Sequence, residues 1–297
     1  MPDADDEYLF YQTVLGAWPM GDSLTAEEFG LFRQRIEQYM LKAVKEAKVN
    51  TSWLNPNPEY ESAVAEFTRA ALDPVGNSRF LADLEQFKKR IEPPGQVNGL
   101  AQALLKVGSP GVTDIYQGCE LWDLSLVDPD NRRPVDFALR QRLLEELDRE
   151  ASLDRLGLAR RLAAQMTDSR AKLFVLSQGL RFKRLHSELF ASGEYLPLAA
   201  SGARRAHLLC FCRRLREAVV VVVVPRLVAA MIESSGISAN LRNTFIHLPA
   251  SCAGANLRDV FTGRSLRPEE RDGEVMISAG EVLRDFPVAL LESSAND

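Results

Sequence analysis

Apolar positions in the first part of the chain recur at the spacing of helices. Thr25 and Glu28 have the arrangement of a capping box, in which two side chains satisfy backbone N–H groups at the first turn of a helix. Apolar residues then follow at intervals of three and four, which gives one buried stripe. The pattern predicts an amphipathic helix over about 26–48.

Further helices are expected before residue 108. Asn57 and Pro58 supply an N-cap and a first-turn proline, and the helix that they start should stop before Asp73. Another helix should carry apolar residues on one face and end at the prolines of residues 93–94. A short apolar helix over 97–107 follows, closed by a glycine.

The pattern then changes to that of an α/β protein. Residues 112–116 form a short β-type run between turn residues, and a polar loop follows over 119–137. A leucine-rich helix is expected over 138–150. This order is typical of one βα unit. A later helix should run from Asp168 to about residue 186.

The last third of the chain is predicted to be β. Six consecutive valines at 219–224 are typical of a strand that is buried on both faces. Turn residues separate the later strands, and the whole predicts a small antiparallel β-sandwich. The expected fold class is therefore α+β. Strands are expected at 207–213, 218–224, 244–248, 258–261, 274–277 and 286–292.

Composition narrows the functional classes. The 297 residues include 46% hydrophobic and 26% charged residues, which is an ordinary globular composition with room for two domains. A net charge of −5 argues against a nucleic-acid partner, because phosphate binding needs a clustered surplus of Lys and Arg. The longest apolar stretch, 218–224, is far shorter than the ~20 residues that cross a bilayer, so no membrane partner is expected.

Neither a metal site nor a secretion signal is expected. The cysteines form no CxxC pair, and the three histidines are far apart in sequence, whereas structural zinc sites use ligand pairs at such spacings. The first seven residues are acidic where a signal peptide would be basic. We therefore expect a cytoplasmic protein with reduced thiols. The cysteines are Cys119, Cys210, Cys212 and Cys252.

The segment over 109–137 holds the most concentrated candidate chemistry. Its carboxylates accept hydrogen bonds, its arginines donate them, and its aromatic rings offer flat faces, a mixture that suits a sugar. In α/β proteins, ligands bind beyond the carboxyl ends of strands, where this loop would lie. The alternative is that Asp and Asn simply form turns, fixed by Arg–Asp pairs. Asp128 and Asp130 are not predicted to be a catalytic pair of acids, because nothing in the sequence places an acid and a nucleophile across a cleft.

A second candidate lies between two of the expected helices. Trp53, with Asn55 nearby, could stack on a glucose ring, although a tryptophan packed between helices is an equal alternative. The full set of candidate substrate contacts is Trp53, Asn55, Gln117, Glu120, Trp122, Asp123, Asp128, Asp130, Asn131, Arg132, Arg133 and Asp136.

The sequence PGVTDIYQGCELWDLSLVDPDNRRPVDF at 110–137 closely resembles a segment of the maltooligosyl trehalose synthase family, around the last strand of its barrel. Thr113 stands where proline is usual, and Cys119 where a small polar residue is usual. Other stretches agree, and the resemblance covers essentially the whole chain. They are YLFYQTVLGAWP at 8–19, KEAKVNTSWLNPNPEYE at 45–61, ELFASGEYLPL at 188–198, VFTG at 260–263 and FPVALL at 286–291.

The resemblance implies the C-terminal part of a (β/α)8-barrel enzyme of the α-amylase superfamily. That family converts the reducing-end α-1,4 linkage of a maltooligosaccharide into an α,α-1,1 linkage, with retaining chemistry on three carboxylates and no cofactor. Those carboxylates come from strands upstream of anything matched here. This chain is therefore expected to have no catalytic residue of its own and to need a missing N-terminal barrel region as partner.

The resemblance also implies three regions. Residues 1–98 would be a helical insertion, 99–190 the last barrel strand and helix with the helices that follow, and 191–297 the C-terminal β-sandwich. Two alternatives remain open. The chain could be a non-catalytic module that binds maltooligosaccharide or docks onto a separate barrel, or it could be part of an α-amylase-type hydrolase.

Overall fold

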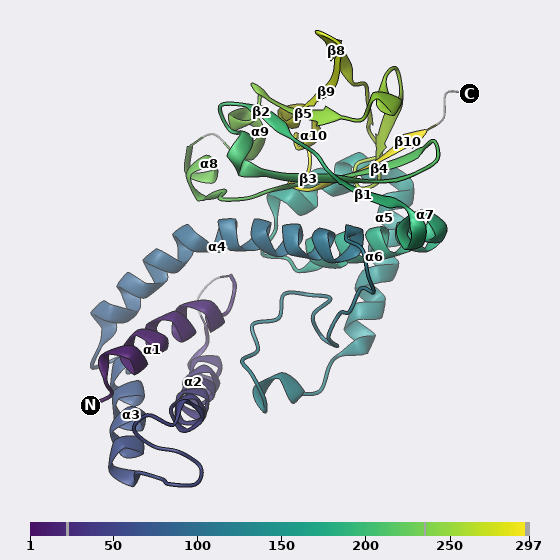
Figure 1. Cartoon of the computed structure of the whole chain (residues 1–297). Coiled ribbons are helices and arrows are strands. Elements are labelled where there is room, and N and C mark those ends of the chain that lie inside the picture. Colours follow the sequence, from purple (N-terminus) through teal and green to yellow (C-terminus); the bar gives the residue numbers. More distant parts are fainter. Residues whose placement is uncertain (22–23, 235, 295–297) are drawn as a thin grey trace. The chain divides into compact units, whose positions relative to one another are not determined.

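In a computed structural model, which describes residues 1–21, 24–234 and 236–294, the chain forms two compact units (Figure 1). The first unit consists of Met1–Glu92 and Asp123–Val135. The second consists of Pro93–Trp122 and Asp136–Asp297. Each unit has its own apolar core, so each is described by itself.

The first unit is helical. The capping box is present, with the Glu28 N–H donating to Thr25 Oγ1 and the Thr25 N–H to the Glu28 carboxylate. Asn57 caps the third helix through a hydrogen bond from the Tyr60 N–H, as predicted. The buried face of the second helix packs into the core of this unit, around Phe32 and Ile36. The helices are α1 (Ala4–Ala17), α2 (Ala26–Ala47) and α3 (Pro58–Ala71), with the 3-10 turn η1 (Asp130–Arg132).

Helix α4 (Ser78–Gly108) corrects one prediction. The expected stop at Pro93 and Pro94 does not occur, because the helix runs through both prolines. Leu84 packs in the core of the first unit, whereas Leu100 and Leu104 pack in a core of the second. Each half is thus held by its own core. Pro93 and Pro94 have no N–H to donate to the carbonyls four residues earlier, so the helix continues through them without those two backbone hydrogen bonds.

Three helices of the second unit follow the polar loop. The predicted helix over 138–150 is longer than expected, with non-helical angles at Asp154, and the predicted helix near Asp168 begins two residues later. The three are α5 (Phe137–Ala164), α6 (Arg170–Leu185) and α7 (Ser187–Ser192).

The strand predicted over 112–116 is absent. A strand needs a hydrogen-bonded neighbour, and no strand of the described residues pairs with this segment. Side chains fix it instead, with Lys183 Nζ donating to Thr113 Oγ1 at 2.9 Å and Thr113 Oγ1 donating to the Lys106 carbonyl at 3.1 Å. Val112 is 99% exposed.

The β region forms two antiparallel sheets, as predicted. One has the strand order β1-β3-β4-β10-β6-β7 and the other β2-β5-β9-β8. The strands are β1 (Glu194–Pro197), β2 (Ala200–Gly202), β3 (Leu208–Leu215), β4 (Ala218–Pro225), β5 (Thr244–Leu248), β6 (Asn256–Asp259), β7 (Ser265–Leu266), β8 (Glu269–Arg271), β9 (Glu274–Ser278) and β10 (Ala289–Ser294).

Two predicted strands are displaced. The strand expected at 258–261 is β6 and ends at Asp259, because the Asp259 carboxylate accepts hydrogen bonds from the N–H groups of Phe261 and Thr262 and turns the chain. The strand expected at 286–292 is β10, which begins at Ala289. The short segments α8 (Ala229–Ser234), α9 (Ile237–Asn240), α10 (Ala279–Val282), η2 (Arg205–His207) and η3 (Ala250–Cys252) were not predicted.

Strand β4 is buried on both faces, which confirms the interpretation of the valine run. Side chains alternate across a strand, so its valines fall into two sets. Val219, Val221 and Val223 belong to the core between the two sheets. Val220, Val222 and Val224 belong to the core that the six-stranded sheet shares with α5 and α6.

None of the helices in the described parts of the chain combines the length and the apolar character that crossing a bilayer requires. The division into regions 1–98, 99–190 and 191–297 stays a prediction about a larger enzyme.

Candidate functional site

The segment over 123–135 is anchored to helix α2 by one arginine. Arg35 donates from Nε to Asp130 Oδ1 at 2.9 Å and from Nη2 to Asp130 Oδ2 at 2.8 Å. Its Nη2 also donates to the Leu124 carbonyl at 2.9 Å, and Lys42 donates to the Asp128 carbonyl. A two-point arginine–carboxylate pair of this kind fixes orientation as well as distance.

Asp130 is also the centre of the turn. Its Oδ2 accepts the Leu126 N–H at 2.7 Å, and Arg133 lies 3.3 Å from its Oδ1. Burial alone would raise the pKa of Asp130, but the hydrogen bonds from Arg35 and Leu126 and the charge of Arg133 hold that pKa below its usual value. A carboxyl group that stays ionised cannot serve as a general acid near neutral pH.

The remaining polar side chains of this segment make local contacts. Asp128 pairs with Arg132, and the peptide bond between Asp128 and Pro129 is cis. Arg133 Nη2 donates to Ser125 Oγ at 3.1 Å, and Asp123 Oδ1 accepts the Ser125 N–H at 2.9 Å. Asn131 Oδ1 is buried and accepts no hydrogen bond from the described residues. Several of the predicted sugar contacts thus hold the loop, as the turn interpretation expects.

The loop after α2 presents an exposed tryptophan. Lys45 Nζ pairs with Glu61 Oε2 at 2.9 Å and lies 4.8 Å from the centre of the Trp53 ring. The buried Thr51 donates from Oγ1 to Glu61 Oε1 at 2.7 Å and accepts the Asn57 N–H at 2.9 Å. The hydrogen bonds from Thr51 and Lys45 lower the pKa of Glu61. Trp53 itself is 60% exposed, which excludes the packed alternative.

Trp53 and Asn55 belong to the same turn. The Asn55 N–H donates to Ser52 Oγ at 2.9 Å, and the Ser52 N–H donates to the Asn55 carbonyl at 3.2 Å. Asn55 lines a cavity of about 370 Å³ with Thr51, Ser52 and Asn57. The turn therefore combines a flat apolar face with nearby amide and hydroxyl groups.

In the second unit, Glu120 and Trp122 are engaged in the protein. Glu120 Oε2 accepts from Arg140 Nε at 2.9 Å and from the Gly118 N–H at 3.0 Å. Trp122 Nε1 donates to the Met166 carbonyl at 2.7 Å. A Cβ added to Gly99 would lie 2.6 Å from the Trp122 ring, so α4, which contains Gly99, packs directly against the indole.

The two other candidates lie at the ends of this stretch. Gln117 is exposed in a turn. Asp136 caps α5, with its Oδ1 accepting the Leu139 N–H at 2.8 Å.

The structure therefore groups the candidates into three local sets. Trp53 and Asn55 share one turn of the first unit, the residues from Asp123 to Arg133 share a second segment of that unit, and the rest lie in the second unit. Sequence reasoning missed Arg35, Lys45 and Arg140. Their partners are distant along the chain, and no local pattern marks them.

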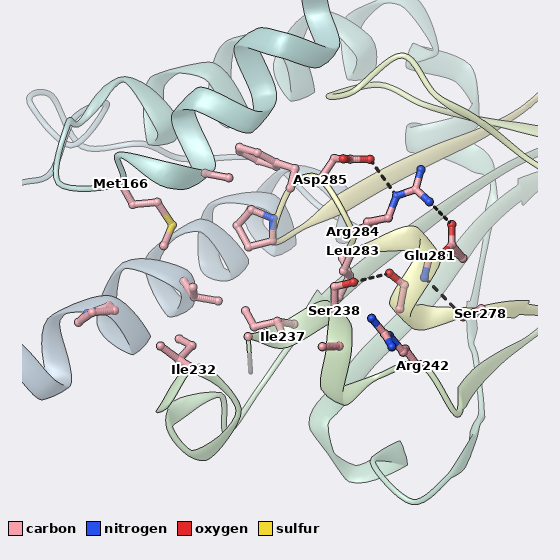
Figure 2. Close-up of a pocket in the computed structure, with 18 residues that line it drawn as sticks. Met166, Ile232, Ile237, Ser238, Arg242, Ser278, Glu281, Leu283, Arg284 and Asp285 are labelled. Atoms are coloured by element: carbon pink, nitrogen blue, oxygen red, sulfur yellow. Dashed lines mark hydrogen bonds and ion pairs between the residues drawn. The ribbon is translucent and has the colours of Figure 1, made fainter. Parts of the chain in front are cut away.

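Another cavity lies within the second unit (Figure 2). It has a volume of about 790 Å³, and Met166, Ile232 and Ile237 line one side while Arg242 and Arg284 line the other. No sequence pattern pointed to it. In the described residues, no three or more His, Cys, Asp or Glu side chains come together as a metal site would require.

Comparisons with known proteins show what this chain is similar to. No protein-family model matches the chain. Curated proteins from two strains of Mycobacterium tuberculosis, provisionally named maltooligosyl trehalose synthase, are each 35% identical over 212 residues, which is 71% of this chain and 24% of theirs.

Two solved structures that match this chain are also described as maltooligosyl trehalose synthases. The maltooligosyltrehalose synthase from Arthrobacter ramosus is 33% identical and matches 97% of this chain and 32% of its own, with a TM-score of 0.74. A hypothetical maltooligosyl trehalose synthase from Sulfolobus tokodaii is 28% identical over 98% of this chain and 32% of its own, with a TM-score of 0.65. The chain thus spans between 24% and 32% of the length of these proteins.

Proposed function

We propose that this chain, whose sequence and fold match a segment of maltooligosyl trehalose synthases, supplies the C-terminal portion of an enzyme that converts a reducing-end α-1,4 linkage into an α,α-1,1 linkage. The observation that carries the proposal is the match to the Arthrobacter ramosus synthase over 97% of this chain at 33% identity. On this proposal the substrate is a maltooligosaccharide, and the protein acts in the cytoplasm.

The proposed sugar contact with the clearest geometry is Trp53. An exposed indole offers an apolar face of the size of a pyranose ring, and Lys45 lies over this ring. Asn55 in the same turn offers an amide that can donate to and accept from hydroxyls.

The segment over 123–135 would border the sugar. Arg132 has a side chain that is 71% exposed, so it can turn toward a ligand while Arg35 and Asp130 keep the backbone in place. The other predicted contacts of this segment would act mainly by fixing its shape.

The bond-breaking carboxylates would come from the missing N-terminal barrel region. Asp130 is held ionised by Arg35, and a retaining mechanism needs one carboxyl group that can donate a proton. In the intact enzyme, residues 99–190 would complete the barrel, and the segment over 112–116 would gain the strand partners that it needs. The helical region over 1–98 would help to exclude water from the glycosyl intermediate.

A binding and turnover experiment tests the proposal. The purified chain is titrated with maltopentaose by calorimetry, and the mixture is then analysed for non-reducing product. We expect binding without turnover. Trp53→Ala should weaken binding by about tenfold, because it removes both stacking and apolar burial. Leu54→Ala is the matched control, since Leu54 is the next residue, is 98% exposed and should not change the affinity.

Three results would contradict the proposal. Formation of trehalose-ended sugar by the chain alone would show that it carries its own catalytic carboxylates. Release of free glucose after the chain is combined with the N-terminal two thirds of the Arthrobacter ramosus enzyme would favour the hydrolase alternative. Binding of maltopentaose with no activity in that combination would favour the separate binding module.

A further inference from the structure

The cavity of about 790 Å³ in the second unit has two chemically different walls (Figure 2). The apolar wall includes Val97 from α4, Met166 from the turn before α6, and Ile232 and Ile237 from the segment between β4 and β5. The opposite wall carries Arg242, Glu281 and Arg284. A volume in this range is typical of sites that bind small molecules.

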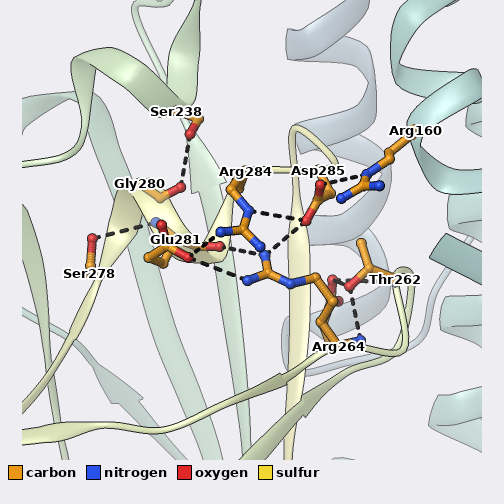
Figure 3. Close-up of polar contacts among 10 residues, drawn as sticks. Arg160, Ser238, Thr262, Arg264, Ser278, Gly280, Glu281, Arg284 and Asp285 are labelled. Carbon is orange, nitrogen blue, oxygen red and sulfur yellow. Dashed lines mark hydrogen bonds and ion pairs between the residues drawn. The ribbon is translucent and has the colours of Figure 1, made fainter. Parts of the chain in front are cut away.

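The polar wall is built around a buried carboxylate (Figure 3). The Asp285 side chain is only 6% exposed and accepts from Arg160 Nε at 2.8 Å and from Arg264 Nη1 at 2.9 Å. Arg284 donates to Glu281 Oε2 at 2.9 Å, and Arg264 lies 3.3 Å from the same oxygen. Both acids of this wall are therefore paired within the protein, Asp285 with Arg160 and Arg264, and Glu281 with Arg284 and Arg264.

Because both acids of the cavity wall already have arginine partners, the charge of Arg242 is not balanced by either of them. Two arginines (Arg242 and Arg284) and two acids (Glu281 and Asp285) line the cavity, and Arg160 and Arg264 pair with the acids from outside the lining. Burial alone would raise the pKa of Asp285, but the hydrogen bond from Arg160 and the nearby guanidinium charges hold that pKa below its usual value. Asp285 thus stays charged and keeps its arginines in place.

Arg242 is the member of this set that is available to a ligand. It is exposed at the cavity wall, and no side chain of the described residues forms a hydrogen bond or an ion pair with it. Its backbone is held closely, because a Cβ on Gly280 would lie 3.0 Å from the Arg242 Cα. Ser238 Oγ donates to the Gly280 carbonyl at 3.0 Å and ties the same turn together.

We propose that this cavity binds a small organic anion with an apolar body, whose charged group pairs with Arg242 and whose body lies on the apolar wall. Arginine matches the planar geometry of carboxylate, phosphate and sulfonate groups, and the apolar wall excludes a ligand that is charged throughout. A neutral oligosaccharide fits less well, because Phe286, the one aromatic residue among the described lining residues, is only 2% exposed and offers no ring face for stacking. The cavity belongs to the second unit and Trp53 to the first, and this proposal does not rest on the proposed sugar contact.

The test uses anilinonaphthalene sulfonate as the probe, followed by its fluorescence in a titration of the full chain. We expect saturable binding at one site. N-phenylnaphthylamine, which has the same rings without the sulfonate, should bind at least tenfold more weakly, because it lacks the charged group. Arg242→Glu should weaken binding of the sulfonate by about tenfold or more, and Arg242→Gln should weaken it less.

Arg267→Glu is the matched control, because Arg267 is exposed in the same unit and does not line the cavity. Far-UV circular dichroism checks that each variant is folded. Equal sulfonate binding by the Arg242→Glu and Arg267→Glu variants would overturn the proposal. Displacement of the probe by maltotriose would also overturn it, since the cavity would then be a sugar site.

Discussion

Replacing Gly108 by alanine should destabilise the chain only while Val222 keeps its full side chain. Gly108 is the last residue of α4, and a Cβ built on it would lie 2.7 Å from Val222 Cγ2 and 3.3 Å from Phe211 Cζ. Carbon atoms pack at about 3.5–4.0 Å, so one of the two elements would have to move. Val222 is fully buried in a central strand and has little freedom at χ1.

The magnitude follows from two opposing effects. Overpacking of a tight core costs about 1–3 kcal/mol, and alanine in place of glycine in a helix returns up to about 1 kcal/mol. Gly108→Ala should therefore lower the free energy of unfolding by about 1–2 kcal/mol. Val222→Ala removes two methyl groups, and it should cost about 2–3 kcal/mol once the cavity is included.

In the double variant the sign of the glycine substitution should reverse. The new methyl group at position 108 would occupy part of the space that Val222→Ala leaves, and the gain in helix propensity would remain. Gly108→Ala should then raise the free energy of unfolding by about 1 kcal/mol, which gives a coupling energy of about 2 kcal/mol or more between the two positions.

Urea unfolding followed by far-UV circular dichroism measures the four members of the cycle. Gly95→Ala is the control, because Gly95 lies in the same helix, is exposed and has no atom within 4 Å of an added Cβ. It should stabilise the chain by up to about 1 kcal/mol in both backgrounds. The reasoning is refuted if Gly108→Ala has the same effect with and without the Val222 substitution.

Two further predictions concern carboxylates, one buried and one partly buried. Burial raises the pKa of Asp259 to about 6, so the folded state binds the Asp259 proton more tightly than the unfolded state does. Proton binding therefore stabilises the fold at low pH by about 3 kcal/mol. This contribution should be lost as the pH rises from about 4 through 6. Asp259→Asn should remove this fall, measured as urea midpoints at each pH. Arg35→Met should leave Asp130 without its main partner, lower the free energy of unfolding by about 1–3 kcal/mol and speed proteolysis within 123–135. Arg132→Met, which removes an exposed ion pair, should change neither the free energy of unfolding nor the rate of proteolysis.

The sequence predicted the fold best where burial imposes a period. The strand at 244–248 and the capping box at Thr25 and Glu28 were both correct, because alternation and capping depend on neighbouring residues. Strands β1 and β8 were missed because they are short and mostly exposed, with no apolar period to mark them. The prediction of a strand at 112–116 was wrong for a different reason. The residues there suit a strand, but a strand also needs a hydrogen-bonded neighbour.

The sequence indicates which residue types gather in the candidate site, but it does not show what each residue does there. The loop over 117–137 was selected because it is rich in polar groups, but whether Asp130 binds a ligand or holds the loop depends on Arg35, which lies 95 residues away. The exposure of Trp53 depends likewise on how the following helix packs. The cavity beside Arg242 could not be predicted, because it is assembled from segments that share no motif.

The valine run of β4 has a consequence for how the sheet stays aligned. Six identical side chains offer no distinction between the two faces, so sliding the strand by one residue would line both cores with valine as before. The correct pairing must then come from outside the run. The two-residue turn at Arg216 and Glu217, where Arg216 adopts a φ of 55°, joins the paired residues Leu215 and Ala218. An insertion in this turn should change the pairing register and therefore the neighbours of residues at the ends of the strand, such as Pro225. The valines in the middle of the strand would still face valine-lined cores.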